Sequence, residues 1–149
     1  EKLVAESLCF LFSKDIFNGY FSNSYTDFIN SFPEEIRIDI IDLMSNLDKY
    51  YNDPVFIIAA DTPFVEIDTI KKLSKQKSQI ALASDGEFIH YLCGFYSPSV
   101  ANIARQMIKS KDLRLANLAK ICECESIEFG NLKQFFNINT KADYEEANI

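Results

Sequence analysis

A buried strand that ends on a carboxylate carries the clearest chemistry in this sequence. In "FIIAADTPFV", residues 56–65, five apolar residues run without a break into Asp61. In open α/β sheets, ligands bind outside the carboxyl ends of the strands, which is where Asp61 is expected. A hard cation such as Mg²⁺ needs only one or two carboxylates there, because phosphate oxygens and waters supply its other ligands. Asp61 is therefore a candidate ligand of a metal-bound nucleotide.

A purely structural interpretation of Asp61 is also open. Thr62 can cap a helix whose first position is Pro63, since Ser, Thr, Asp and Asn cap helices well and Pro suits the first turn. Acidic side chains are favourable near helix N-termini, so Asp61 could simply support that start. Spacing alone does not decide between the two interpretations.

The pattern of elements predicts an α/β fold. The segments 55–60 and 79–84 are apolar throughout, which is typical of strands buried on both faces of a parallel sheet covered by helices. An Asp-Gly turn at 85–86 indicates that the strand 88–96 pairs antiparallel with 79–84. Further strands or extended segments are expected at 8–13, 126–129 and 135–140, and helices from Pro33 to before Asn52 and at 63–75, 98–109, 113–120 and 141–147. We predict one domain spanning residues 1–149, with a three-layer, mainly parallel, Rossmann-like sheet and helices on both faces.

Composition excludes several classes of protein. The net charge is −7 and the basic residues are scattered, which disfavours binding to a nucleic-acid backbone. No apolar run is long enough for a membrane span, so a cytoplasmic protein is expected. The pair Cys122 and Cys124 lacks the partners of a zinc site, because the sequence has one His and no second Cys pair. That single residue, His90, is expected to be packed or hydrogen-bonded rather than a general base.

Several motifs, in matching order and spacing, carry a family resemblance. These are "EKLVAESLCFLFSK", "VFIIAADTPFV", "HYLCGFYSPSV" followed by "KDLRLANLAK", and "FFNINTKADYEEA". Together they resemble the molybdenum cofactor guanylyltransferases, which are Rossmann-like nucleotidyltransferases. Sugar nucleotidyltransferases share the Asp-Thr-Pro strand, whereas the Asn-x-Asn-Thr ending points to the molybdopterin branch.

The resemblance implies a reaction and a set of site residues. Such enzymes transfer GMP from GTP to the phosphate of molybdenum-bound molybdopterin and release pyrophosphate. The partners expected from the resemblance are molybdoenzymes or other cofactor-biosynthesis proteins. By position, Asp61 would bind Mg²⁺, Asn137 and Asn139 would line the pterin side, and Arg114 would offer a cation to phosphate. The alternatives are an ordinary solvated helix residue for Arg114 and backbone hydrogen bonding near a strand end for the two asparagines.

The family's Gly-rich phosphate loop does not occur in these 149 residues, where all four glycines are isolated. In the family that loop and its strand come first, and its N–H groups cradle the nucleotide phosphates. We therefore expect the chain to be the C-terminal part of a longer nucleotidyltransferase domain, lacking the first strand. The alternatives are a non-catalytic binding or interaction domain of the same fold, or a cytidylyl- or sugar nucleotidyltransferase.

Overall fold

The computed structural model describes residues 40–59, 61–138 and 140–147. The predicted strand at 8–13, the predicted helix start at Pro33 and the candidate residue Asn139 lie outside them. Four described strands form one sheet, in the spatial order β1 (Val55–Ile58), β3 (Ile89–Tyr96), β2 (Ile80–Ser84) and β4 (Cys124–Glu128).

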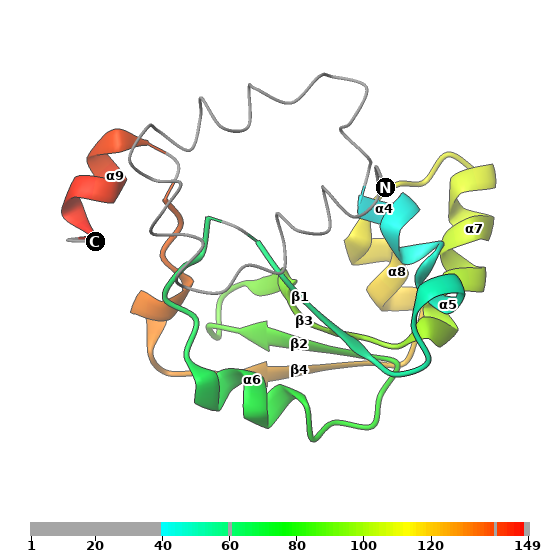
Figure 1. Cartoon of the computed structure of the whole chain (residues 1–149), viewed down its shortest axis with the longest axis horizontal. Coiled ribbons are helices and arrows are strands. Elements are labelled where there is room, and N and C mark those ends of the chain that lie inside the picture. Colours follow the sequence, from blue (N-terminus) through cyan, green and yellow to red (C-terminus); the bar gives the residue numbers. More distant parts are fainter. Residues whose placement is uncertain (1–39, 60, 139, 148–149) are drawn as a thin grey trace.

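Strand directions bring three carboxyl ends to one edge of the sheet. β3 is antiparallel to both β1 and β2, whereas β4 is parallel to β2. Among the described strands, β1, β2 and β4 therefore run in the same direction and β3 runs against them. The predicted antiparallel pair across the Asp-Gly turn is confirmed, and the turn contains Gly86 at φ 91°. Figure 1 shows β2 and β4 pointing toward the side where the C-terminus lies.

The central strand β2 is buried on both faces, as its apolar sequence predicts. Ile80 and Leu82 belong to a core shared with the helices on one face, and Ala81 and Ala83 belong to a second core on the other. Successive side chains of a strand point to opposite faces, so β2 divides the two cores. The α/β layering predicted from the sequence is thus confirmed.

Helices cover both faces of the sheet (Figure 1). On one face the core is closed by α4 (Ile40–Met44), α5 (Leu47–Tyr50), η3 (Pro98–Val100), α7 (Ala101–Lys109) and α8 (Leu115–Ile121). On the other face it is closed by α6 (Ile67–Leu73) and η4 (Leu132–Phe135), and α9 (Lys141–Glu146) follows near the C-terminus. None of the helices within the described ranges is long and apolar enough to span a bilayer.

The predicted continuous helix ending before Asn52 is wrong in its described part, because it breaks between α4 and α5. The Ser45 hydroxyl and the Asn46 side-chain amide both donate to the carbonyl of Asp42, at 2.7 and 2.8 Å. The Asn46 backbone N–H then bonds to Leu43 instead of continuing the helical pattern to Asp42. Ser and Asn compete with helical hydrogen bonding in this way, and an apolar stripe does not reveal the competition.

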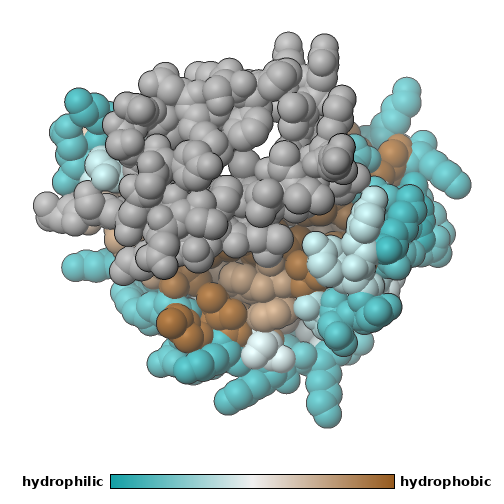
Figure 2. Space-filling model, in the orientation of Figure 1, coloured by the Kyte–Doolittle hydropathy of each residue, from teal (hydrophilic) through white to brown (hydrophobic). Residues whose placement is uncertain are grey.

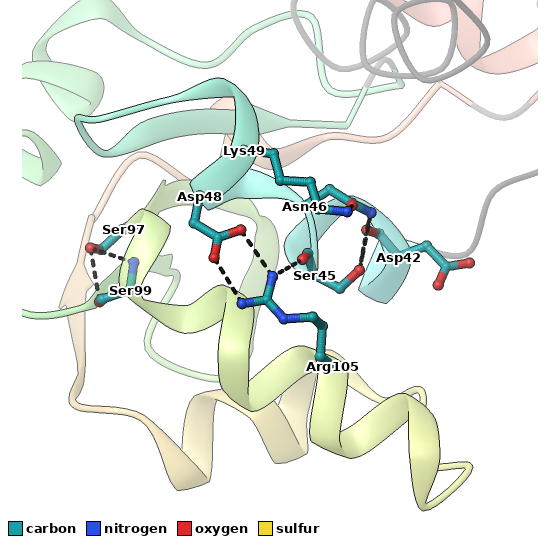
Figure 3. A network of polar contacts seen from close by, with 8 residues as sticks. All are labelled: Asp42, Ser45, Asn46, Asp48, Lys49, Ser97, Ser99 and Arg105. Atoms are coloured by element: carbon teal, nitrogen blue, oxygen red, sulfur yellow. Dashed lines mark hydrogen bonds and ion pairs between the residues drawn. The ribbon is translucent and has the colours of Figure 1, made fainter.

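One arginine connects α7 with α5 and with the break between α4 and α5 (Figure 3). The Arg105 guanidinium on α7 binds both carboxylate oxygens of Asp48 on α5, at 2.9 and 2.8 Å, and also donates to the Ser45 carbonyl at 2.7 Å. Hydrogen bonding from Arg105 holds the pKa of Asp48 below its ordinary value. The planar guanidinium suits such a forked contact, so α5 is held at a fixed place on α7.

β3 pairs with two neighbouring strands, and a bulge interrupts its register with β2. Leu82 of β2 faces Gly94, but the next residue, Ala83, faces His90, so Tyr91–Cys93 are extra residues on β3. The Leu92 carbonyl in the bulge accepts a hydrogen bond from Ala59, just beyond β1. Gly94 allows the close approach, because a Cβ there would lie 2.3 Å from the Ala81 carbonyl oxygen.

Candidate functional site at the carboxyl edge of the sheet

The chain turns sharply directly after β1. The Thr62 N–H and hydroxyl both donate to the Ala59 carbonyl, at 3.2 and 2.8 Å. The predicted helix start at Thr62 and Pro63 is therefore wrong: α6 begins at Ile67, and its N-cap, Glu66, makes no side-chain capping bond. Because the Thr62 hydroxyl is used within its own turn, it does not cap a helix.

This turn removes the structural explanation for Asp61. The carboxylate lies several residues before α6, so it does not support the helix start. Its Oδ1 atom is buried and has no hydrogen-bond partner within the part of the chain that the structure describes. Burial raises the pKa of Asp61, and the residue's own backbone N–H opposes that shift. An unsatisfied buried oxygen is unfavourable by itself, and such an atom calls for an explanation.

The donor set fits a hard cation that is shared with a phosphate ligand. Within the described residues, the surroundings of Asp61 included, no group of three or more His, Cys, Asp or Glu side chains could hold a metal ion. Asp61 on its own would provide a single anionic oxygen, and Mg²⁺ commonly takes one or two carboxylates together with substrate phosphates and waters. Its Oδ1, which lacks a partner among the described residues, is thus suited to a metal that arrives with a nucleotide.

The segment 131–138 is fastened to the start of α6. Gln134 is buried, and its side-chain oxygen accepts hydrogen bonds from the Thr69 hydroxyl at 2.7 Å and from the Glu66 N–H at 3.3 Å. The Asn131 side-chain amide donates to the Glu66 carboxylate. Buried polar groups are retained when they are hydrogen-bonded, so Gln134 fixes η4 on this face of the sheet.

The same segment reaches Asp61 through its backbone. The Ile138 N–H donates to the Asp61 carbonyl at 2.8 Å. The structure therefore brings Asp61 together with Ile138, the residue between the two candidate asparagines, and Asn137 is exposed just before it. The interpretation that Asn137 faces the pterin stays a prediction.

The threonine of the Asn-x-Asn-Thr motif has a structural role. Thr140 forms a capping box with Asp143 at the start of α9: the hydroxyl accepts from the Asp143 N–H at 3.2 Å, and the Asp143 carboxylate accepts from the Thr140 N–H at 2.8 Å. Such reciprocal bonds satisfy the free donors of a first turn. The end of the motif is therefore explained by the helix that follows it.

A cavity of about 770 Å³ opens beside this edge. Its lining comes from the loop after β1, the turn after β2, η4 and the end of α9, and consists of Phe64, Glu66, Asp85, residues 131–136, Glu146 and Ala147. In the view of Figure 2, apolar side chains gather toward the middle of the visible surface, and hydrophilic ones lie around its lower and right rim. Its size is typical of a ligand site, but neither Asp61 nor Asn137 is among its lining residues.

Arg114 is not joined to this site by any described contact. It precedes α8, its side chain is 76% exposed, and its Nε donates to Asp112 at 3.1 Å. In Figure 1, α8 lies beside α7, on the opposite side of the molecule from η4 and α9. A phosphate-binding role for Arg114 remains a prediction.

Sequence reasoning missed two residues of the edge, Asp85 and Gln134. Asp85 was treated only as a turn residue, yet it also accepts a hydrogen bond from His90 at 2.9 Å. The expectation that His90 is hydrogen-bonded and packed is confirmed by that bond and by its stacking on Phe135. An Asp-Gly turn with a His five residues after the Asp could have suggested this pair, whereas nothing in the sequence marks Gln134 as buried.

Solved structures with this arrangement of elements define the class of fold. A crystal structure of a protein from Aquifex aeolicus VF5 superposes with a TM-score of 0.60 at 26% identity, covering 68% of this chain and 56% of that one. Molybdopterin-guanine dinucleotide biosynthesis protein A from Archaeoglobus fulgidus superposes with a TM-score of 0.57 at 20% identity, covering 70% and 58%. The second likeness shows the fold: this chain has the α/β fold of that protein.

Sequence relatives are more specific. A molybdenum cofactor guanylyltransferase of Helicobacter pylori strain J99 is 34% identical over 94 residues, which are 62% of this chain and 45% of the relative. The protein of the same name from Campylobacter jejuni subsp. doylei is 28% identical over 129 residues, 85% of this chain and 68% of the relative. No protein-family model matches the chain. The resemblance to molybdenum cofactor guanylyltransferases is thus confirmed, and the chain spans about half the length of the Helicobacter relative.

Proposed function

We propose that the protein containing this chain transfers GMP from GTP to molybdopterin-bound molybdenum cofactor and releases pyrophosphate. The observation that carries the proposal is the buried carboxylate oxygen of Asp61 at the carboxyl edge of the sheet, which has no hydrogen-bond partner among the described residues. The names of the Helicobacter and Campylobacter relatives support the choice of reaction. The proposal includes a cytoplasmic location for the protein and delivery of its product to molybdoenzymes.

In this proposal Asp61 holds Mg²⁺ and thereby fixes the nucleotide at the sheet edge. The bound ion supplies charge neutralisation at the phosphates, which is the main requirement of phosphoryl-type transfer. The metal ion would give the buried oxygen of Asp61 the partner that the described residues do not provide. Its carboxylate is a fixed charge in a partly buried place, where electrostatic stabilisation is stronger than in water.

The remaining residues position the two substrates. Ile138 ties the Asn-x-Asn segment to the backbone of Asp61, so that Asn137 and Asn139 are proposed to bind the pterin next to the metal. Arg114 is proposed to offer its cation to a phosphate, which requires it to leave Asp112. Guanidinium groups suit phosphate oxygens in geometry as well as charge.

The decisive experiment uses the full-length protein with GTP, Mg²⁺ and molybdenum-bound molybdopterin. We expect equal amounts of pyrophosphate and a guanine dinucleotide product. CTP in place of GTP, and a sugar phosphate in place of the pterin, serve as controls. Turnover with CTP alone or with the sugar phosphate alone would reassign the substrate within the nucleotidyltransferases.

A non-catalytic binding domain of the same fold is the second candidate, because the cavity beside the sheet edge could hold a ligand without catalysis. It predicts that the full-length protein binds the pterin cofactor without consuming GTP. The pyrophosphate measurement separates the two candidates directly.

A further inference from the structure

His90 lies between two parts of the site that are distant in sequence. On one side its Nε2 is 2.9 Å from Oδ2 of Asp85, in the turn after β2. On the other side its ring stacks on Phe135 of η4, with 4.2 Å between ring centroids and 13° between the planes. The two side chains of the polar pair are 24% and 16% exposed, so the contact is largely sheltered from water.

Asp85 is itself rigidly held, which makes it a firm support. Its Oδ1 accepts from the backbone N–H of Glu87 at 2.9 Å and of Phe88 at 2.7 Å. These bonds, the one from Phe88 first, hold the pKa of Asp85 below its ordinary value. An ionised carboxylate only accepts hydrogen bonds, so Nε2 of His90 carries the proton in this contact. The orientation of the imidazole ring follows from that bond.

The ring of His90 is placed by the bulge of β3. His90 pairs with Ala83 after Tyr91–Cys93 have been passed over in the register, so it occupies a position that a regular strand would not give it. The ring then meets Phe135, which is buried and also contacts Phe129 at a centroid distance of 6.5 Å. Offset aromatic stacking of this kind adds to simple burial.

Phe135 is only three residues from the contact with Asp61. Phe135 follows Gln134, whose bonds anchor η4 to α6, and Ile138 donates to the Asp61 carbonyl. Between these two anchors, the same segment stacks on the ring of His90. Asp85, His90 and Phe135 therefore form a continuous support from the turn after β2 to the segment that carries Asn137.

We propose that His90 is a positioning residue: anchored by Asp85, it holds residues 135–138 against Asp61 and so sets the place of Asn137 relative to the metal ligand. The expected effect of His90 on catalysis rests on the proposed function. Its structural role in holding residues 135–138 does not. His90 does not touch the reacting atoms in this assignment, and it is not a general base.

Amide hydrogen exchange of the full-length protein tests the structural part without any substrate. The Ile138 amide reports the bond to Asp61, and the Ser97 amide, bonded to Gln79 at the other edge of the sheet, is the internal reference. We expect His90→Ala to speed exchange at Ile138 by at least about tenfold relative to Ser97, as local opening does. His90→Phe keeps a ring against Phe135 but loses the bond to Asp85, so it should restore protection at Ile138 only in part, to a rate between those of wild type and His90→Ala.

Phe56→Leu is the matched control, because it removes another ring contact, with Phe95 at 5.0 Å, from the same core. It should change Ile138 and Ser97 equally. An unchanged Ile138 in His90→Ala, a uniform acceleration of all amides, or failure of His90→Phe to restore protection would each overturn the proposal.

Kinetics test the catalytic part. In the guanylyltransferase assay, His90→Ala should lower kcat/KM for the pterin substrate by about tenfold, the scale typical of lost supporting contacts, and leave the KM for GTP unchanged. His90→Phe should recover part of the activity, because it keeps the ring but loses the bond to Asp85, whereas loss of a general base would lower activity equally in both variants. Absence of turnover in the wild type would refute the proposed function and leave the exchange result to decide the role of His90; unchanged kinetics in an active His90→Ala protein would refute the positioning role.

Discussion

Replacing Asp61 by Asn removes the negative charge from the candidate metal site and keeps its shape. The substitution leaves a side-chain oxygen, the Ile138–Asp61 backbone bond and the Thr62 turn in place. We expect full-length Asp61→Asn to fold normally and to lose at least about a hundredfold in kcat, which is the scale for removal of one preorganised charge-stabilising group.

The magnitude follows from where the carboxylate lies. A hundredfold loss corresponds to about 2.7 kcal/mol of barrier, since each tenfold change is about 1.36 kcal/mol. On the side of stability, the described structure gives Oδ1 no partner that the substitution would remove. Loss of a cap would lower stability, but Asn caps about as well as Asp, and Asp61 is not the cap of α6.

The pH dependence of stability provides an independent check in metal-free buffer. Burial raises the pKa of Asp61 above its ordinary 3.8, so the folded state binds the proton more tightly than the unfolded state. Ionisation of Asp61 therefore costs stability as pH rises from that ordinary value through the folded-state pKa. Asn does not titrate, so the Tm of Asp61→Asn relative to wild type should increase across this interval and then level off.

The assay measures pyrophosphate release against Mg²⁺ concentration, with differential scanning calorimetry of the same samples. Asp68→Asn is the charge-matched control, because the Asp68 side chain is 82% exposed on α6. It should keep its activity. Asp61→Asn with near-normal turnover, or with an early melt and retained turnover, would return the residue to a structural role and refute the metal assignment.

Three further predictions concern the rest of the chain. The isolated 149-residue chain should show no guanylyltransferase turnover and weak or no GTP binding by calorimetry, because it contains no Gly-rich phosphate loop; robust turnover would mean that phosphate binding is organised differently. Gly94→Ala should destabilise the fold by about 3 kcal/mol in urea denaturation or prevent folding, because its Cβ would lie 2.3 Å from a carbonyl oxygen; Gly130→Ala, with no atom within 4 Å, should change little, and equal effects at both would contradict the close-approach explanation. Lys111→Gly should raise stability by about 0.5–1 kcal/mol, because Lys111 has φ 59° just after α7. Gln106→Gly, at an exposed position inside α7, should lower stability by about 1 kcal/mol, and a loss at both positions would show that the left-handed backbone is not strained.

The layers of the fold could be predicted because they depend on local patterns. Uninterrupted apolar runs located β1 and β2, and the Asp85-Gly86 turn gave the antiparallel partner β3. The predicted helix start after β1 is wrong because the Thr62 hydroxyl donates to the Ala59 carbonyl instead of accepting from a helical N–H. The same sequence suits both arrangements.

The site could be predicted only in part. Asp61 is a candidate because ligands bind at strand ends in α/β sheets, and its position at a strand end follows from local sequence; its role as a metal ligand stays a prediction. Its neighbours depend on contacts across long separations: Ile138 pairs with Asp61, and Gln134 with Thr69. No periodicity encodes such contacts, since a buried Gln and a surface Gln read alike until the partner hydroxyl is known. The three-residue bulge that places His90 is invisible for the same reason.

The central place of β3 also sets the order in which the sheet can be assembled. Among the described strands, β1 pairs only with β3, although β3 follows it by roughly thirty residues in the chain. During synthesis at about 5–20 residues per second, β1 therefore waits on the order of seconds before this partner is made. The β2–β3 hairpin, joined by a short turn, can close within microseconds once it is free, whereas β1 must close a long loop to dock. The strand that leads to Asp61 is thus expected to join the sheet late. We expect slow folding or premature association of the nascent protein to start from the apolar residues of this strand.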